Sequence, residues 1–159
     1  MSYTNADGLR VLTNDDQGAI KTQGTSPGAM HQTLVVDVAL TSVKTTFGAV
    51  DIDLNNPVIP ANSLILSATL VMTAAATSSG SATLDIGTYN AAGTAIQATG
   101  IDAAIALTAI DAIGETVRCD GVHTTVTGLV ATDAYVGLKW NTAAFTAGTG
   151  KLYIEYVKL

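Results

Sequence analysis

No charged side chain occurs between Asp53 and Asp85, and this neutral stretch limits what the chain can fold into more than any other feature. Its apolar part, "LILSATLVMTAAA" (64–76), is too short for a membrane span, which takes about 20 apolar residues. Within it, side chains alternate between an apolar face and a more polar face rich in Thr and Ser. The apolar face holds Leu64, Leu66, Ala68, Leu70 and Met72. This period of two predicts a β-strand over residues 64–73.

Similar alternation predicts several more strands. They cover residues 33–43, 49–54, 82–89, 134–140 and 151–157. A Ser/Gly-rich turn at 76–81 predicts that the strands at 64–73 and 82–89 form a hairpin, and "NAAG" (90–93) predicts another turn. The dipeptide Asp120-Gly121, which lies between the segments 115–119 and 122–126, predicts a second hairpin, because both turn positions need positive φ. Cys119 and His123 then lie on opposite faces of that hairpin.

Residues 101–113 are the exception to this strand pattern. Asp102 can cap a helix, Gly114 follows the segment, and Ile105, Ala109 and Ile113 recur every four residues. This spacing predicts a short helix or helical turn. The sequence as a whole predicts an all-β protein, an antiparallel jelly-roll-like β-sandwich with one short helix.

The first 30 residues differ from the rest of the chain. Turn-forming residues dominate them, and too few apolar residues are present to close a core. We therefore expect residues 1–30 to form an extended N-terminal arm and residues 31–159 to form the sandwich domain. The arm either lies across a neighbouring subunit or folds back as an edge strand of its own sandwich. Its candidate contact residues are Leu9, Val11, Leu12 and Ile20.

Charged residues make up 13% of the 159 residues, about half the usual share, while Thr (24) and Ala (25) are abundant. Two explanations stay open: part of the surface is covered by assembly, or Thr, Ser and Asn replace charges as surface polar groups. The net charge is -6 and no Lys/Arg cluster occurs, so no nucleic-acid partner is expected. The first ten residues have neither a basic nor an apolar region, so no export signal is expected.

No motif predicts catalysis. "DIDLNN" (51–56) begins like a calcium loop, but it lacks the Gly and Glu that such a loop requires later. Cys119 and His123 are a possible nucleophile and base, yet the predicted hairpin separates them. Trp140, Tyr153 and Tyr156 could line a sugar-binding surface, although aromatic residues in sandwiches more often belong to the core. We expect no enzyme activity, no catalytic residue, no metal site and no cofactor.

Two segments resemble virion proteins of tailed bacteriophages. "PVIPANSLILSATLVMTAAATSSGSATLDIGT" (57–88) is similar to their pattern of an Ile-Pro-Ala/Gly loop, a strand, a Thr/Ala-rich part and a strand of the type Ala-Thr-Leu-x-Ile/Val-Gly. "TAGTGKLYIEYVKL" (146–159) is similar to their closing strand. Together these segments cover under a third of the chain, and they match in strand style rather than in any catalytic signature.

This resemblance implies a jelly-roll capsid decoration (cement) protein or a module of a head or tail fibre. The first implies a homo-oligomer that binds the major capsid protein on the outer capsid surface of the virion and is made in the host cytoplasm. Because decoration proteins often sit at threefold positions, the resemblance implies a trimer. The second implies binding of host-surface glycans. An accessory domain of a hydrolase is a third, less favoured possibility. None of these involves a membrane.

Overall fold

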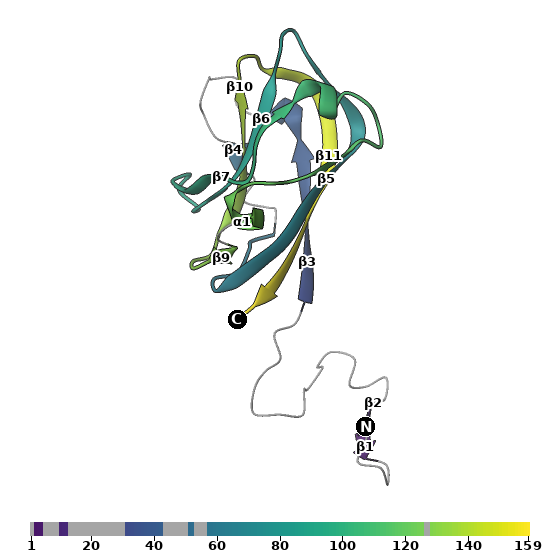
Figure 1. Cartoon of the computed structure of the whole chain (residues 1–159), viewed down its shortest axis with the longest axis vertical. Coiled ribbons are helices and arrows are strands. Elements are labelled where there is room, and N and C mark those ends of the chain that lie inside the picture. The colour runs from purple at the N-terminus through teal and green to yellow at the C-terminus, as the bar shows by residue number, and fades with distance from the viewer. Residues whose placement is uncertain (1, 5–9, 13–30, 43–50, 53–56, 126–127) are drawn as a thin grey trace.

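Two antiparallel β-sheets pack face to face in the computed structural model, which describes residues 2–4, 10–12, 31–42, 51–52, 57–125 and 128–159 (Figure 1). The large sheet has the order β3 (His31–Ala39), β11 (Phe145–Lys158), β5 (Ser63–Ser78) and β8 (Thr116–Arg118), and β9 (Leu129–Val130) also pairs with β5. The small sheet has the order β4 (Asp51–Ile52), β10 (Tyr135–Asn141), β6 (Thr83–Tyr89) and β7 (Ala95–Ala106). The prediction of an all-β antiparallel sandwich is confirmed.

The strand order is that of a jelly roll. Leaving out β9, each step along the chain from β3 to β11 crosses to the other sheet, except the hairpin that joins β6 to β7. The predicted turn at 90–93 lies in that hairpin, where Gly93 has a φ of 82°. The predicted hairpin over residues 64–89 is wrong, because β5 belongs to the large sheet and β6 to the small one. The turn signal at 76–81 marks a real reversal, but the chain changes sheets there.

The core fills the space between the two sheets. Leu70, Leu152 and Ile154 enter it from the large sheet, while Leu84 and Ile86 enter it from the small sheet, and all five side chains are completely buried. The alternation that predicted the strands therefore also produces the core, because every second side chain of each strand points between the sheets.

A bulge near the start of β5 changes which side chains reach that core. The pairing with β11 shifts between Glu155 and Tyr156, so that Leu66 has no partner in the ladder. Ala68, Leu70 and Met72 are buried as one face, whereas before the bulge Ile65 is buried and Leu66 is exposed. The single alternating face predicted for 64–73 is therefore wrong for Leu64 and Leu66, because one extra residue reverses the inward and outward positions.

Of the short helix or helical turn predicted over residues 101–113, only a helical turn is present. β7 continues to Ala106, and only a single 3-10 turn, η3 (Leu107–Ala109), follows it. Asp102 pairs in register with Ile86 and Ile105 with Leu84, so this segment completes the edge of the small sheet. Pairing with β6 and the burial of Ile105 outweigh the helical spacing of the sequence.

The one short α-helix among the described residues is α1 (Val122–Thr125), where the sequence predicted the second strand of a hairpin. The carbonyl oxygen of Gly121 accepts hydrogen bonds from the backbone N–H of Thr124 and from the hydroxyl groups of Thr124 and Thr125. The Gly121 N–H in turn donates to the carbonyl of Ile101, at 2.9 Å. A Cβ on Gly121 would lie 2.5 Å from the backbone of Ile101, so glycine is required here for close approach and not for a hairpin turn.

Candidate interaction surfaces

The predicted contact residues of the N-terminal arm are only partly visible. Leu9 and Ile20 lie outside the described residues, while Val11 and Leu12 belong to β2 (Arg10–Leu12). β2 pairs with β1 (Ser2–Thr4), and this two-stranded ribbon joins neither sheet of the sandwich. Figure 1 draws the ribbon away from the sandwich, beyond the end at which β3 begins. The contacts proposed for these four residues stay a prediction.

Cys119 and His123 do not form a nucleophile–base pair. The predicted hairpin that was to separate them is absent, but each side chain is buried with its own partner. The His123 Nε2 lies 3.1 Å from Thr88 Oγ1, between the sheets. The Cys119 thiol lies against Asp102, and burial together with the Asp102 charge raises its pKa to about 12. The thiol is therefore protonated near neutral pH and is a poor nucleophile.

Asp51 begins β4, and the following residues of the calcium-like motif, 53–56, lie outside the described part of the chain. Among the described residues, no three His, Cys, Asp or Glu side chains come together in a way that could hold a metal ion. No helix in the same part of the chain is long and apolar enough to cross a membrane.

Trp140, Tyr153 and Tyr156 do not share one surface. Trp140 and Tyr156 are buried, the first in the small sheet and the second in the large sheet. The Tyr156 hydroxyl donates to Gln32 Oε1 at 2.6 Å. Only Tyr153 is exposed, on the outer face of the large sheet. The favoured interpretation, that these aromatic residues belong to the core, is therefore confirmed for Trp140 and Tyr156, which cannot line a sugar-binding surface.

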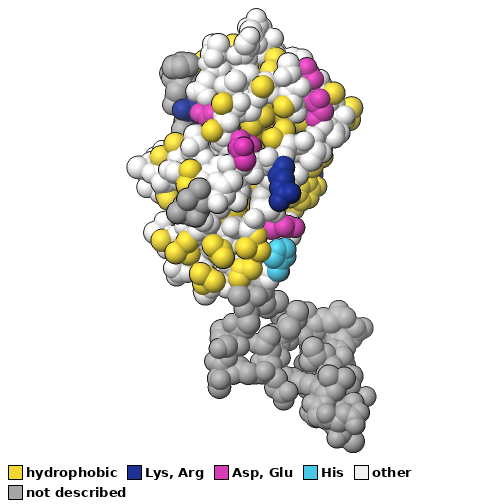
Figure 2. Space-filling view, viewed as in Figure 1, with side chains coloured by type: hydrophobic (Ala, Val, Ile, Leu, Met, Phe, Trp, Pro, Cys, Tyr) yellow, Lys and Arg dark blue, Asp and Glu magenta, His cyan; other side chains and the backbone are white. Residues whose placement is uncertain are grey.

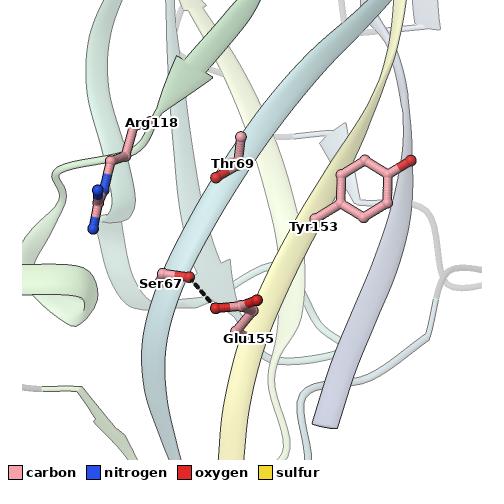
Figure 3. Close-up of a pocket in the computed structure, with 5 residues that line it drawn as sticks. All are labelled: Ser67, Thr69, Arg118, Tyr153 and Glu155. Carbon is pink, nitrogen blue, oxygen red and sulfur yellow. Dashed lines mark hydrogen bonds between the residues drawn. The ribbon is translucent and has the colours of Figure 1, made fainter.

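An open hollow of about 300 Å³ lies on that outer face (Figure 3). Ser67 and Thr69 of β5 form its floor, while Arg118 of β8 and the pair Tyr153 and Glu155 of β11 stand on its two sides. The Ser67 hydroxyl donates to Glu155 Oε2 at 2.7 Å. Because Tyr153, Thr69 and Arg118 pair in register across three strands, the Tyr153 and Arg118 Cα atoms lie about 10 Å apart. Hydroxyls, a cation and an anion thus surround one small space.

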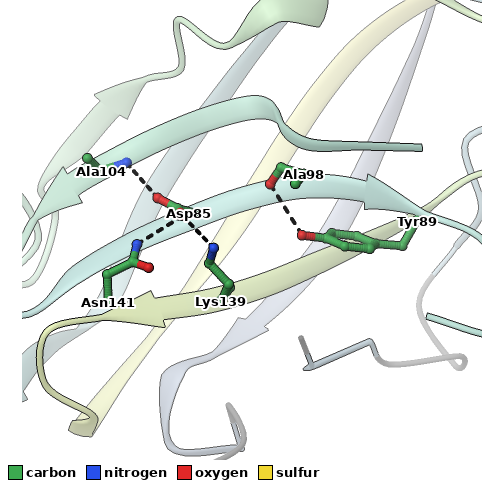
Figure 4. Close-up of polar contacts among 6 residues, drawn as sticks. All are labelled: Asp85, Tyr89, Ala98, Ala104, Lys139 and Asn141. Carbon is green, nitrogen blue, oxygen red and sulfur yellow. Dashed lines mark hydrogen bonds and ion pairs between the residues drawn. The ribbon is translucent and has the colours of Figure 1, made fainter. Parts of the chain in front are cut away.

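A second polar group lies on the outer face of the small sheet, where Asp85 and Tyr89 are buried and Lys139 and Asn141 are partly buried (Figure 4). The Asp85 carboxylate accepts hydrogen bonds from the Ala104 N–H at 2.8 Å and from Asn141 Nδ2 at 2.9 Å. Lys139 Nζ lies 3.3 Å from the same carboxylate. Burial, with a smaller effect of the Asp85 charge, raises the pKa of Tyr89. Since Asp85 and Tyr89 are buried and hydrogen-bond to the backbone of β7, we interpret the group as structural and not as a binding site.

The third candidate is an apolar end of the sandwich, here called the leucine end and consisting of Leu64, Leu66, Leu129 and Leu159. Leu66 is 43%, Leu129 50% and Leu159 68% exposed. Leu64 pairs in register with Leu129, and the Leu159 N–H donates to the Asn62 carbonyl. Figure 2 shows hydrophobic side chains gathered at this end. Exposed apolar side chains that gather in one place often mark an interaction site.

Sequence reasoning missed both the hollow and the leucine end. A signal for the hollow exists, because Ser67 and Thr69 on one strand and Tyr153 and Glu155 on another are spaced by two and share a face. Which strands are neighbours, however, depends on the jelly-roll order. The leucine end has no comparable signal, because the bulge at Leu66 cannot be read from the alternation.

The jelly-roll sandwich has known structural counterparts. No protein family model matches the sequence, and no curated protein matches it. A chain of the capsid of Ralstonia phage GP4 has a TM-score of 0.58 at 20% sequence identity, covering 88% of this chain and 92% of that chain. A chain of the capsid asymmetric unit of cyanophage Pam1 has a TM-score of 0.52 at 18% identity, covering 92% of this chain and 98% of that one. At such low identities the similarity establishes a shared fold.

Proposed function

We propose that this protein is a structural component of a tailed-phage virion, and specifically a capsid decoration protein. The main support is the similarity in fold to chains of two phage capsids, which extends over at least 88% of this chain and 92% of each capsid chain. The counterparts are therefore about as long as this protein, so the likeness is to a whole small chain and not to one domain of a large one. The strand patterns at 57–88 and 146–159 add independent support from sequence.

In this proposal the mechanism is mechanical. Copies of the protein sit on the outer capsid surface, contact neighbouring major capsid subunits and add buried area between them. A surface with few charges suits this role, because burying a charge in an interface requires a partner or costs free energy. No enzymatic step is involved, in line with the buried, protonated thiol of Cys119.

The test is reconstitution on capsids. Particles of the phage that encodes the protein, prepared without it, are mixed with the purified protein, sedimented, and examined by quantitative gel analysis and cryo-electron microscopy. We expect saturable binding with hundreds of copies on each particle and a higher temperature of particle disruption. Absence of binding, or a few copies confined to the tail, would contradict a decoration role.

The N-terminal arm and the trimer are separate parts of the proposal. Deleting residues 2–28 should leave the unfolding free energy of the sandwich unchanged and weaken particle binding. A loss of several kcal/mol in stability would show instead that the arm belongs to the sandwich domain. Light scattering of the full-length protein at micromolar concentration tests self-association, for which we expect a trimer. A monomer both free and on the particle would refute that part.

A glycan-binding fibre module is the second candidate, and the hollow on the large sheet is the observation that favours it. Hydroxyl, guanidinium and carboxylate groups around one space are suited to hydrogen-bonding a sugar. A glycan array with the full-length protein tests this. Arg118→Ala and Thr69→Val should abolish any signal, while Lys151→Ala, on the same face outside the hollow, should not. If the array is blank, or if the hollow variants bind as well as the control, this candidate fails.

A further inference from the structure

The leucine end lies beside the point at which the N-terminal segment joins the sandwich. His31, the first residue of β3, pairs in register with Val157, Val157 pairs with Leu64, and Leu64 pairs with Leu129. These four residues form one row across four neighbouring strands. Neighbouring strands are about 4.8 Å apart, so His31 and Leu129 are separated by about 14 Å. The first residue of β3 therefore lies in the same row of the large sheet as the exposed Leu129.

The size and shape of the leucine end limit what can cover it. Leu66, Leu129 and Leu159 are the main exposed side chains there, and a stable interface between two globular faces buries about 800 Å² on each partner. A few leucines at the tip of a sandwich fall short of that area. An extended segment with spaced apolar side chains is a better fit, because it can lie along the tip and continue over neighbouring surface.

The chain itself contains such a segment. Residues 9–20 include Leu9, Val11, Leu12 and Ile20 within an otherwise polar sequence. In the structure of the single chain, the leucine end is exposed, and β2, which carries Val11 and Leu12, pairs with β1 and with no strand of the sandwich. Among the described residues, no strand of the same chain therefore covers this surface.

We propose that the leucine end is a docking site for the N-terminal segment, residues 9–20, of a second copy of this chain. Each copy then supplies one segment and accepts one. Such a head-to-tail contact uses two different surfaces, and it forms a closed ring when the rotation between copies closes. The contact is independent of the capsid, so it can be correct even if the decoration role is not.

The test is site-specific cross-linking between two differently sized copies. One copy, extended by a tag, carries Leu129→Cys, and the other carries Val11→Cys; Cys119 can stay, since it is buried. The matched control places the cysteine at Ile113, which is 75% exposed in the loop after η3. After mild oxidation we expect several-fold more mixed-size disulfide dimer with Leu129→Cys than with Ile113→Cys. Equal yields from the two positions would overturn the proposal.

Two further measurements separate docking between copies from docking within one chain and from a folding defect. A single chain carrying both Val11→Cys and Leu129→Cys should form cross-links whose yield falls on dilution. An internal disulfide that is independent of concentration would overturn docking between copies.

Leu129→Asp should shift the light-scattering mass toward the monomer while Ile113→Asp does not, with both variants showing the parent circular dichroism spectrum. If Leu129→Asp folds and still assembles like the parent, the leucine end is not the docking site.

Discussion

The shortest ion pair of the described residues should contribute less to the stability of the folded protein than a longer one. Lys151 Nζ and Asp37 Oδ1 are 2.6 Å apart, but the Asp37 side chain is 74% exposed. Lys139 Nζ and Asp85 Oδ2 are 3.3 Å apart, and the Asp85 side chain is only 9% exposed. Water screens the first pair and competes for it, whereas the second is largely shielded. We therefore predict that Asp85→Ala strongly destabilises the protein and that Asp37→Ala does not.

The expected size of the effect follows from the interactions that the Asp85 carboxylate makes. Asp85→Ala removes the acceptor for the Ala104 N–H and for Asn141 Nδ2, as well as the counterion of Lys139. Breaking a buried ion pair by removing one partner costs about 3–5 kcal/mol. Because Lys139 is 26% exposed and can regain water, we expect the lower value, about 3 kcal/mol. This is a large share of the roughly 5–15 kcal/mol that stabilises a typical domain.

Urea unfolding followed by tryptophan fluorescence provides the assay, since Trp140 is one residue from Lys139. With an m-value of about 2 kcal/mol/M, a loss of about 3 kcal/mol lowers the midpoint by about 1.5 M. Asp85→Asn keeps an acceptor for the Ala104 N–H but loses the charge, so its midpoint should fall between those of the parent and Asp85→Ala. Equal midpoints for Asp85→Ala and Asp37→Ala would refute the argument that burial, and not distance, decides the contribution.

Three further predictions concern the buried groups around α1. Cys119 should be unreactive toward thiol reagents near neutral pH until the protein unfolds, because burial raises its thiol pKa to about 12; rapid labelling of the folded protein would contradict this. Burial also raises the pKa of Asp102, so the folded state binds more protons than the unfolded state between the two pKa values, and stability falls as pH rises through the usual carboxyl range. Asp102→Asn should flatten that fall in urea midpoints measured from about pH 4 to about pH 7, and an unchanged slope would count against the assignment. Gly100→Ala should cost about 1–3 kcal/mol, because its Cβ would lie 2.3 Å from the His123 ring. The free-energy cost of Gly100→Ala should shrink in a His123→Ala background. The cost of Gly121→Ala should not shrink there, because the added Cβ meets the backbone of Ile101. If Gly100→Ala costs the same with and without His123, the contact with the ring is ruled out.

The sequence predicts the fold class well because alternation is a local property. Strands predicted at 82–89, 134–140 and 151–157 correspond to β6, β10 and part of β11. Which strands pair with each other is not a local property. This explains why the two hairpins predicted over residues 64–89 and 115–126 are wrong. Asp120-Gly121 has the composition of a hairpin turn. The Gly121 N–H, however, donates a hydrogen bond to the carbonyl of Ile101, which belongs to another strand, β7. No pattern within residues 115–126 could have predicted that contact.

The candidate surfaces were harder to predict than the fold for a related reason. Leu64 and Leu66 share a face with Ala68 and Leu70 in an unbroken strand, so the sequence groups all four together. The bulge at Leu66 separates them and leaves Leu66 exposed, at the same end of the sandwich as the exposed Leu129 of β9. An apolar surface therefore arises from a residue that the pattern groups with core positions.

The neutral stretch between Asp53 and Asp85 can now be explained largely by the fold itself. Its first strand, β5, lies inside the large sheet with β11 on one side and β8 and β9 on the other, and its second, β6, lies between β10 and β7. In β6 the six residues from Leu84 to Tyr89 are all buried, on both faces of the sheet. Charges are costly at such positions, and the one that ends the stretch, Asp85, has three partners. The lack of charge is thus weak evidence for assembly. The apolar side chains that this fold leaves exposed, at the leucine end, are stronger evidence.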